Sequence, residues 1–191
     1  MTGTTSLAVA QAWIALRAED PEAASALGVA RAHLAAAHGL ERLRRWRVFE
    51  LRGALPGADE LAERLHRSTQ FYNPAKERCA VRGADADALP VAPGEAVALV
   101  VERGGDRRAA AERWWKHETG GKVEVREGTA WVMTFAPGAD AGALAAELAV
   151  AKDRRTGLFC NPHAQDVIVT VGPPELDRWP GARRGRASGA R

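Results

Sequence analysis

Apolar residues follow two different spacings along this chain, and the change from one spacing to the other marks the expected elements. Alternating or continuous apolar runs predict β-strands at residues 7–16, 42–52, 78–82, 96–102, 122–126, 130–135 and 165–171. Between them, apolar residues three or four positions apart predict helices at residues 21–38, 58–70, 107–118 and 140–155. The runs 122–126 and 130–135 form either a hairpin or one bent strand across Glu127-Gly128.

The helix boundaries come from residues that start or stop helices. Asp20 can cap exposed amides at a helix start, and Pro21 suits the first helical position because its missing N–H has no partner there. Gly39 suits the left-handed end of the first helix. The last helix is expected to be about two turns longer than the second, because the segment Pro137–Pro162 is seven residues longer than Pro56–Pro74.

A second pattern repeats at long range. Asn73-Pro74 and Asn161-Pro162 lie 88 residues apart, and each follows a helical run and precedes a short β-prone one. A helix normally ends before such a dipeptide, because proline disfavours helical geometry at the residue before it. The tetrapeptide Pro-Gly-Ala-Asp also occurs twice, at residues 56–59 and 137–140, ahead of each of these helical runs. The repeated order indicates an internal duplication.

The duplication predicts the organisation of the chain. We expect one unit at residues 7–82, a linker at 83–95, a second unit at 96–172 and a disordered basic tail at 173–191, with Trp179 folding back onto the body. Each unit reads β-α-β-(β)-α-β. The predicted fold class is therefore α+β: two such units forming a pseudo-two-fold pair, with antiparallel sheets covered by helices on one face.

Composition narrows the class of protein further. The 191 residues are 46% hydrophobic and 27% charged, with a net charge of +3, which is low for a nucleic-acid binder. The two cysteines cannot build a disulfide framework, the N-terminus lacks a signal-peptide pattern, and no apolar run is long enough to cross a bilayer. We therefore expect a cytoplasmic protein without membrane contact and with nucleic-acid binding disfavoured.

The order of these motifs resembles PurS, the small subunit of phosphoribosylformylglycinamidine synthase in purine biosynthesis. The resemblance rests on three features: Asp-Pro before a helix, a Val-rich strand and Asn-Pro before a last strand. In the first half these are Asp20-Pro21, Arg47–Leu51 and Asn73-Pro74, and in the second Val123–Arg126, Trp131–Phe135 and Cys160–Pro162. The second half departs from it by having Gly105-Asp106-Arg107 where the first has Asp-Pro, and PurS itself is not duplicated within one chain.

The resemblance implies a role without catalysis. A PurS-like subunit bridges the glutaminase and synthetase subunits of the complex, which would be this chain's partners, and self-association into a homodimer stays open. No cofactor, metal or catalytic residue is expected. The candidate partner-interface residues are Arg42, Arg44, Arg45, Asn73, Pro74, Asn161 and Pro162.

A few residues of this chain could support other chemistry. Cys160 and His163 are three residues apart and could form a thiolate–imidazole pair or two metal ligands, but two ligands do not close a zinc site. A buried cysteine and a loop histidine are the expectation, and an enzyme using Cys160 ranks third. The alternative to a PurS-like subunit is a ferredoxin-like binding or regulatory module for RNA or a small metabolite, for which Trp46 and its neighbouring arginines are the candidate contact.

Overall fold

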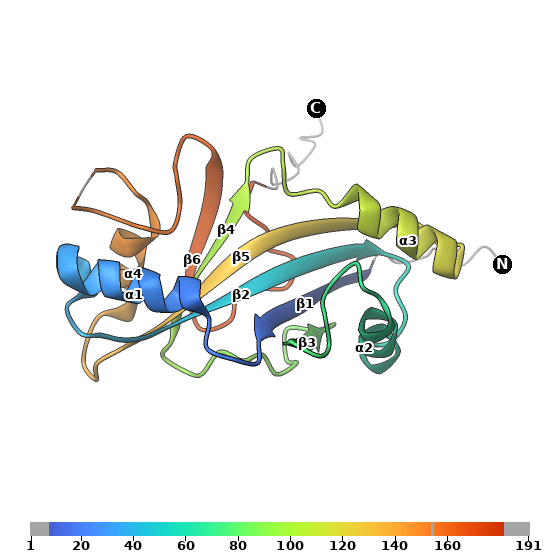
Figure 1. The fold of residues 1–191 in the computed structure, drawn as a ribbon, viewed down its shortest axis with the longest axis horizontal. Helices are drawn as coiled ribbons and strands as arrows, with labels where there is room; N and C mark the ends of the chain where they lie inside the picture. Colours follow the sequence, from blue (N-terminus) through green and yellow to red (C-terminus); the bar gives the residue numbers. More distant parts are fainter. Residues whose placement is uncertain (1–7, 154, 182–191) are drawn as a thin grey trace, which may run out of the picture.

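Six strands form one antiparallel sheet in the computed structural model, which describes residues 8–153 and 155–181. The strands are β1 (Ala8–Leu16), β2 (Leu40–Gly53), β3 (Glu77–Arg82), β4 (Ala96–Glu102), β5 (Val123–Phe135) and β6 (Gln165–Val171). Four α-helices accompany them, α1 (Pro21–His33), α2 (Ala58–Arg67), α3 (Ala109–Thr119) and α4 (Ala141–Ala149), with a short 3₁₀ turn at Ala35–Ala37. The α+β class is confirmed, but the two predicted units share one sheet (Figure 1).

The two halves of the chain contribute their strands to the sheet in the same order. From either outer edge inward come the third, the first and the second strand of one half. The order is β3-β1-β2-β5-β4-β6, so each half of the chain contributes three adjacent strands and β2 meets β5 in the centre. Ile14 pairs with Arg47 in the first half, and Val100 pairs with Thr129 in the second. Arg47 and Thr129 also pair with each other across the centre. A two-fold axis through this pair therefore relates the two halves of the sheet residue by residue.

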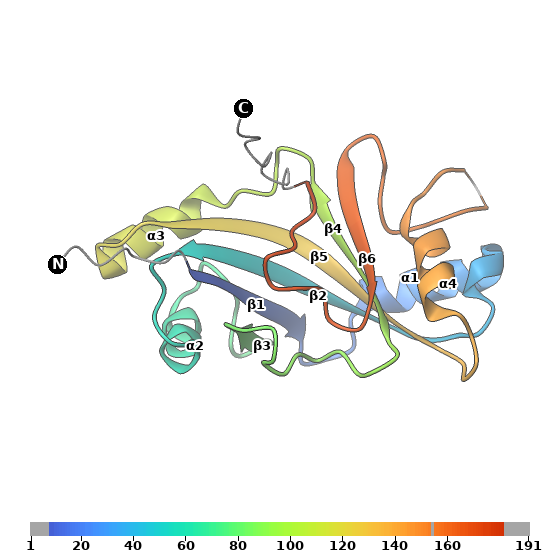
Figure 2. The same ribbon diagram turned by 180° about the vertical axis from the view of Figure 1, so that it is seen from behind.

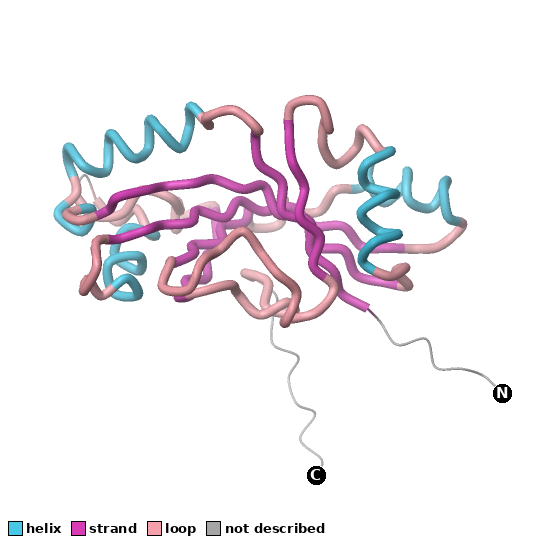
Figure 3. The backbone as a smooth tube through the Cα atoms, turned by 90° about the horizontal axis from the view of Figure 1, so that it is seen from below, coloured by secondary structure: helices cyan, strands magenta, loops and turns pink. Residues whose placement is uncertain are grey.

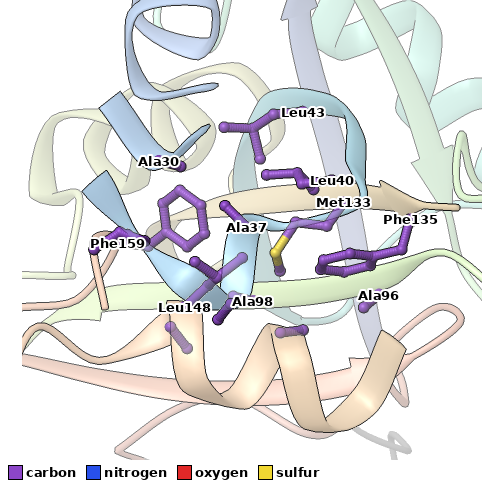
Figure 4. Packing of buried hydrophobic residues seen from close by; sticks show 14 of the residues in the cluster. Ala30, Ala37, Leu40, Leu43, Ala96, Ala98, Met133, Phe135, Leu148 and Phe159 are labelled. Atoms are coloured by element: carbon purple, nitrogen blue, oxygen red, sulfur yellow. The ribbon is translucent and has the colours of Figure 1, made fainter. Parts of the chain in front are cut away.

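All four helices pack on the same face of the sheet. Figure 3 shows them gathered toward its two ends. At one end, α1 and α4 cover Met133 and Phe135 of β5, as Figure 4 shows. At the other end, α2 and α3 cover Val123 and Val125 of the same strand. Because side chains two positions apart point to the same face of a strand, these residues all lie on one side of the sheet.

Each of these two cores mixes residues from both halves of the chain. Ala30 of α1 packs in the same cluster as Leu148 of α4, and Leu65 of α2 packs in the same cluster as Trp115 of α3. Each of these side chains is at most 1% exposed. The predicted units 7–82 and 96–172 therefore do not enclose separate hydrophobic cores.

The opposite face is covered by two irregular segments (Figure 2). Val91 of the loop 83–95 and Trp179 near the end of the chain pack on Trp13, Trp46 and neighbouring strand residues. The prediction of a disordered tail is therefore wrong for residues 173–181, where Trp179 is only 3% exposed. Burying a large indole against this apolar face is favourable in free energy compared with leaving it in water. The predicted return of Trp179 to the body is confirmed. Residues 182–191, like Leu7, lie outside the described residues.

The helices are shorter than predicted, most of all the first and the last. The second ends at Arg67 rather than near Gln70, and the third begins at Ala109 rather than Arg107. The first ends at His33 rather than His38. The last helix was predicted to be about two turns longer than α2, but it spans only nine residues. It ends early because amides of the following loop donate hydrogen bonds to its last carbonyls. The amide of Leu158 donates to Leu148 O at 2.8 Å, and the amide of Cys160 donates to Ala149 O at 2.8 Å. The extra seven residues of the second half therefore form a loop.

Glu127-Gly128, where the sequence allowed either a hairpin or one bent strand, lies inside one continuous strand. β5 runs unbroken from Val123 to Phe135. A Cβ at Gly128 would lie 2.8 Å from Val101 Cγ1 and 2.9 Å from Val100 O. Glycine is needed here because β4 approaches closely, rather than because the chain turns.

The packing of Trp179 gives a test of the second face. Replacing Trp179 with Ala should lower the free energy of unfolding by about 3 kcal/mol, since it empties a buried indole site. Replacing its exposed neighbour Arg178 with Ala should change this free energy by less than about 0.5 kcal/mol. Urea denaturation of the full chain measures both, and equal small effects would contradict the packing.

The mixed cores predict that one half cannot fold as a monomer. A fragment of residues 8–88 lacks α3 and α4, so it leaves the apolar residues of α1 and α2 without their partners. We expect this fragment alone to be unfolded or self-associated by circular dichroism and sedimentation. Mixing it with a fragment of residues 89–181 should restore the native spectrum. A cooperatively folded monomeric 8–88 fragment would contradict this.

Candidate functional site

The two Asn-Pro motifs form the same turn at equivalent places in the fold. The amide of Asn73 donates to Glu77 Oε2 at 2.7 Å, and the amide of Asn161 donates to Gln165 Oε1 at 2.8 Å. In both turns the asparagine Oδ1 accepts the amide two residues later at 3.0 Å. Each turn leads directly into an edge strand, β3 or β6. The repeated sequence motif thus encodes a repeated local structure, in which Asn closes the turn with its own side chain.

An arginine at the end of a neighbouring strand holds each turn. Arg17 follows β1 and donates from Nε to Pro74 O at 3.2 Å. Arg103 follows β4 and donates from Nη2 to Pro162 O at 3.4 Å. The main-chain amides of Arg17 and Arg103 also donate to the carbonyl three residues after each Asn, at 2.9 and 2.8 Å. Sequence reasoning missed this arginine pair, although each directly follows a predicted strand.

The aromatic residues ahead of the two turns pack on equivalent positions of the central strands. Phe71 contacts Phe49 of β2 edge-to-face, with ring centroids 5.3 Å apart. Phe159 stacks on Trp131 of β5, with ring centroids 4.8 Å apart. Both turns are therefore anchored beside the pseudo-two-fold axis.

A polar groove of about 200 Å³ lies near this axis on the helical face, between the two apolar cores. We call it the central groove. Its lining comprises Glu22, Arg45, Val100, Glu102, Arg108, Glu127, Gly128, Thr129, Trp131, Phe159 and Gln165.

Both arginines of the central groove pair with neighbouring carboxylates. Arg45 Nε lies 2.9 Å from Asp20 Oδ2, and its Nη1 lies 2.5 Å from Glu22. Arg108 pairs with Glu127. These pairs tie the starts of α1 and α3 to the central strands, and they leave each of these carboxylates with a cationic partner.

A second, larger cleft of about 480 Å³ runs along β2 near the start of α1. We call it the β2-edge cleft. Arg44 and Arg45, both predicted interface residues, line it but are occupied by internal carboxylates. Arg42, also predicted, is exposed and has no ion pair among the described residues. Sequence reasoning missed Arg78, whose guanidinium lies 4.9 Å from the centroid of the Trp46 ring.

Trp46 cannot serve as the predicted RNA contact in this structure. Base stacking requires an exposed aromatic face, and Trp46 is only 2% exposed. It lies on the face covered by the loop 83–95 and by residues 173–181, with Arg78 above it. Trp46 is therefore a core residue.

Arg44 is held by a buried carboxylate. Glu95 pairs with Arg44 and accepts from Thr134 Oγ1 at 2.6 Å and from the amide of Ala92 at 2.8 Å. Burial by itself raises the pKa of Glu95, but the hydrogen bonds from Thr134 and Ala92 and the charge of Arg44 outweigh it. The pKa of this carboxyl therefore lies below its ordinary value, and Glu95 stays ionised at neutral pH.

The two thiols are in surroundings that disfavour the thiolate. Burial raises the pKa of Cys79 to about 12, and burial also raises the pKa of Cys160, which is 2% exposed. The thiol, rather than the nucleophilic thiolate, is thus the form present at neutral pH. His163 is exposed on the Asn161 turn. Among residues 8–153 and 155–181, no group of three or more His, Cys, Asp or Glu side chains is placed to hold a metal ion.

No protein-family model, curated protein or solved structure matches this chain. None of the described helices has the length and apolar character needed to cross a membrane.

The Glu95 network gives a pH-dependent test. Replacing Glu95 with Gln should lower the free energy of unfolding by about 2 kcal/mol at pH 7, because charge-assisted hydrogen bonds are lost. Since the pKa of Glu95 is lowered in the folded state, its contribution is present above about pH 4.5 and is lost as the pH falls through the folded value.

The two proteins should therefore converge in stability under acid. Thermal unfolding of wild type and the Glu95→Gln variant between pH 3 and pH 7 measures this convergence. An exposed carboxylate, Glu63, provides the matched Gln control. A stability difference that stays constant across this range would contradict the assignment.

Proposed function

We propose that this chain is a non-catalytic, PurS-like subunit of an amidotransferase complex that bridges its glutaminase and synthetase subunits. One observation carries the proposal: two β-α-β-α-β halves meet across β2 and β5 with the register of a two-fold pair. A pseudo-two-fold pair is what the sequence resemblance implies for two fused PurS-like units, whereas the sharing of one sheet was not expected from it.

The detailed contacts support the same interpretation. The two Asn-Pro turns match hydrogen bond for hydrogen bond, although Glu77 is replaced by Gln165. The helices α1 and α3 each pack with a helix of the other half, as helices do in an intertwined dimer. A covalent link would keep such a pair together at any protein concentration, since it raises the effective concentration of each half to roughly millimolar.

The chemistry of the central groove suits a structural role. Arg45 pairs with Asp20 and Glu22, and Arg108 pairs with Glu127, while Glu102 accepts a hydrogen bond from Gln165 Nε2 at 2.6 Å. Ion pairs of this kind fix the relative positions of helices and strands. A rigid surface around the pseudo-two-fold axis is what a bridging subunit needs, because preorganisation lowers the entropic cost of binding.

The contact surface is proposed to include the two turns and the rim of the β2-edge cleft. Asn73, Asn161 and Pro162 are exposed, and Pro74 is half-buried, so the turns are accessible. Arg42 is the predicted arginine best placed for a partner. Arg44 and Arg45 act instead by holding the loop 83–95 and the start of α1 in place.

Reconstitution with the glutaminase and synthetase subunits from the same source tests the function. The purified chain alone should hydrolyse neither glutamine nor ATP. The three proteins together should co-elute in gel filtration and should form amidine product from glutamine. If the chain forms no complex and does not change the rate, the proposed function is wrong.

Variants at the two turns test the contact surface. Replacing exposed Lys76 and His163 with Glu keeps the turn hydrogen bonds, which use main-chain amides and the Asn side chains. We expect this double variant to weaken the complex at least about fivefold. Arg113→Glu on α3 is the matched control, since Arg113 is exposed and far from both turns in sequence. Equal losses in the two variants would point to net charge rather than to the turns.

A further inference from the structure

The central strand β2 has an open edge beside the β2-edge cleft. Pairing between β1 and β2 ends at Ile14 and Arg47. Pairing between β2 and β5 continues beyond this point to Leu40 and Phe135. Residues 41–46 therefore have a neighbouring strand on one side only. An unpaired edge of this length is a template on which another strand can pair.

The second half of the chain shows what occupies the equivalent edge. Residues 123–128 of β5 extend past the end of β4 by the same amount. There the segment before α3 runs along the strand (Figure 1). The amide of Arg108 donates to Val125 O at 2.8 Å, and the amide of Glu127 donates to Asp106 O at 2.7 Å. The chain thus pairs its own extended segment with this edge.

The first half cannot do the same, because its connecting segment is shorter. Four residues, 17–20, join β1 to α1, whereas six residues, 103–108, join β4 to α3. No main-chain hydrogen bond joins residues 17–20 to β2 in the described structure. Under the two-fold axis, Val125 and Glu127 correspond to Leu43 and Arg45. The carbonyl of Leu43 and the amide of Arg45 therefore face away from β5, toward the β2-edge cleft.

The charges at this edge differ between the halves. Arg42 and Arg78 border the β2-edge cleft, are exposed and have no ion pair among the described residues. Their counterparts under the two-fold axis are Glu124 and Asp166. Two arginines without an ion pair among the described residues therefore flank the open edge of β2. In the second half, where the chain pairs its own segment with the edge of β5, acidic residues occupy the equivalent positions.

From this geometry we propose that the open edge of β2 binds an extended acidic segment of a partner protein, which adds as a short antiparallel strand. The pairing of Arg107 with Arg126 in the second half is antiparallel and sets the expected direction. Main-chain hydrogen bonds to Leu43 and Arg45 supply the affinity, and Arg42 and Arg78 select acidic side chains. The inference rests on the proposed function only in that the occupant is a protein partner.

Features of the cleft favour a peptide over a free phosphate. Asp20 accepts from the amides of Glu22 and Ala23, so the start of α1 has few donors left for an anion. Two exposed carboxylates, Glu19 and Glu41, also line the cleft and would repel a compact polyanion. An extended peptide can place its acidic side chains on the arginines while its backbone uses the strand edge.

A pair of synthetic peptides tests the pairing. The probe is a fluorescent octapeptide of alternating valine and glutamate, and its control is the same peptide N-methylated at every second residue. N-methylation removes strand donors without changing charge, so it should weaken binding to the full chain about tenfold or more, as expected for the loss of two hydrogen bonds. A valine–lysine peptide should not bind.

Two variants test the location. The double variant Arg42→Glu with Arg78→Glu should weaken binding of the valine–glutamate peptide about tenfold, since it replaces attraction with repulsion at both rims. Arg113→Glu, on the exposed face of α3, should change binding less than twofold. In amide NMR spectra, Leu43 and Arg45 should shift on peptide addition, and their amide exchange should slow.

Each alternative outcome has a clear meaning. The proposal is wrong if the N-methylated peptide binds equally well, if inorganic phosphate shifts the same amides while the peptide does not, or if the shifts map to the outer edges of β3 or β6. These experiments use the chain alone. Peptide binding without assembly with the amidotransferase subunits would leave the β2 edge supported and the proposed function refuted.

Discussion

The pairing of β2 with β5 is the interaction on which the rest of the structure depends. The two longest strands run antiparallel through the middle of the sheet, with Arg47 opposite Thr129 at the centre. Alternate residues along them belong to both helix-covered cores on one face and to the loop-covered core on the other. Because side chains alternate in direction, a one-residue slip in this register would expose all three cores at once.

The position of the symmetry axis explains why the middle of the helical face is polar. The helices cover the ends of the sheet, so the side chains near Arg47 and Thr129 lie between two apolar cores. Arg47 donates to Glu77 Oε1 at 2.9 Å and to Phe71 O at 3.0 Å. A half-buried arginine is tolerated here because carboxylates and carbonyls surround it, and the same contacts hold the Asn73 turn near the axis.

The differences between the halves are as informative as their similarity. Two additional residues before α3 let the chain cover the edge of β5, and their absence before α1 leaves the edge of β2 open. Glycine at position 128 lets β4 approach closely, whereas the equivalent Trp46 fills the core under Arg78. The two halves of the sheet lie in one chain, so their sequences can differ, which is not possible for two identical chains.

The sequence by itself determined the strands, the helix starts, the α+β class and the two Asn-Pro turns, since these depend on local periodicity, on proline and on short-range capping. It could not show that both halves share one sheet, because edge pairing between β2 and β5 is a contact between distant segments. The lengths of α1 and α4, the burial of Trp46 and Trp179, and the internal pairing of Arg44 and Arg45 were likewise decided by tertiary packing. Local propensity is weak compared with the free energy of burying an indole or pairing a half-buried charge, so these features follow the fold rather than the local sequence.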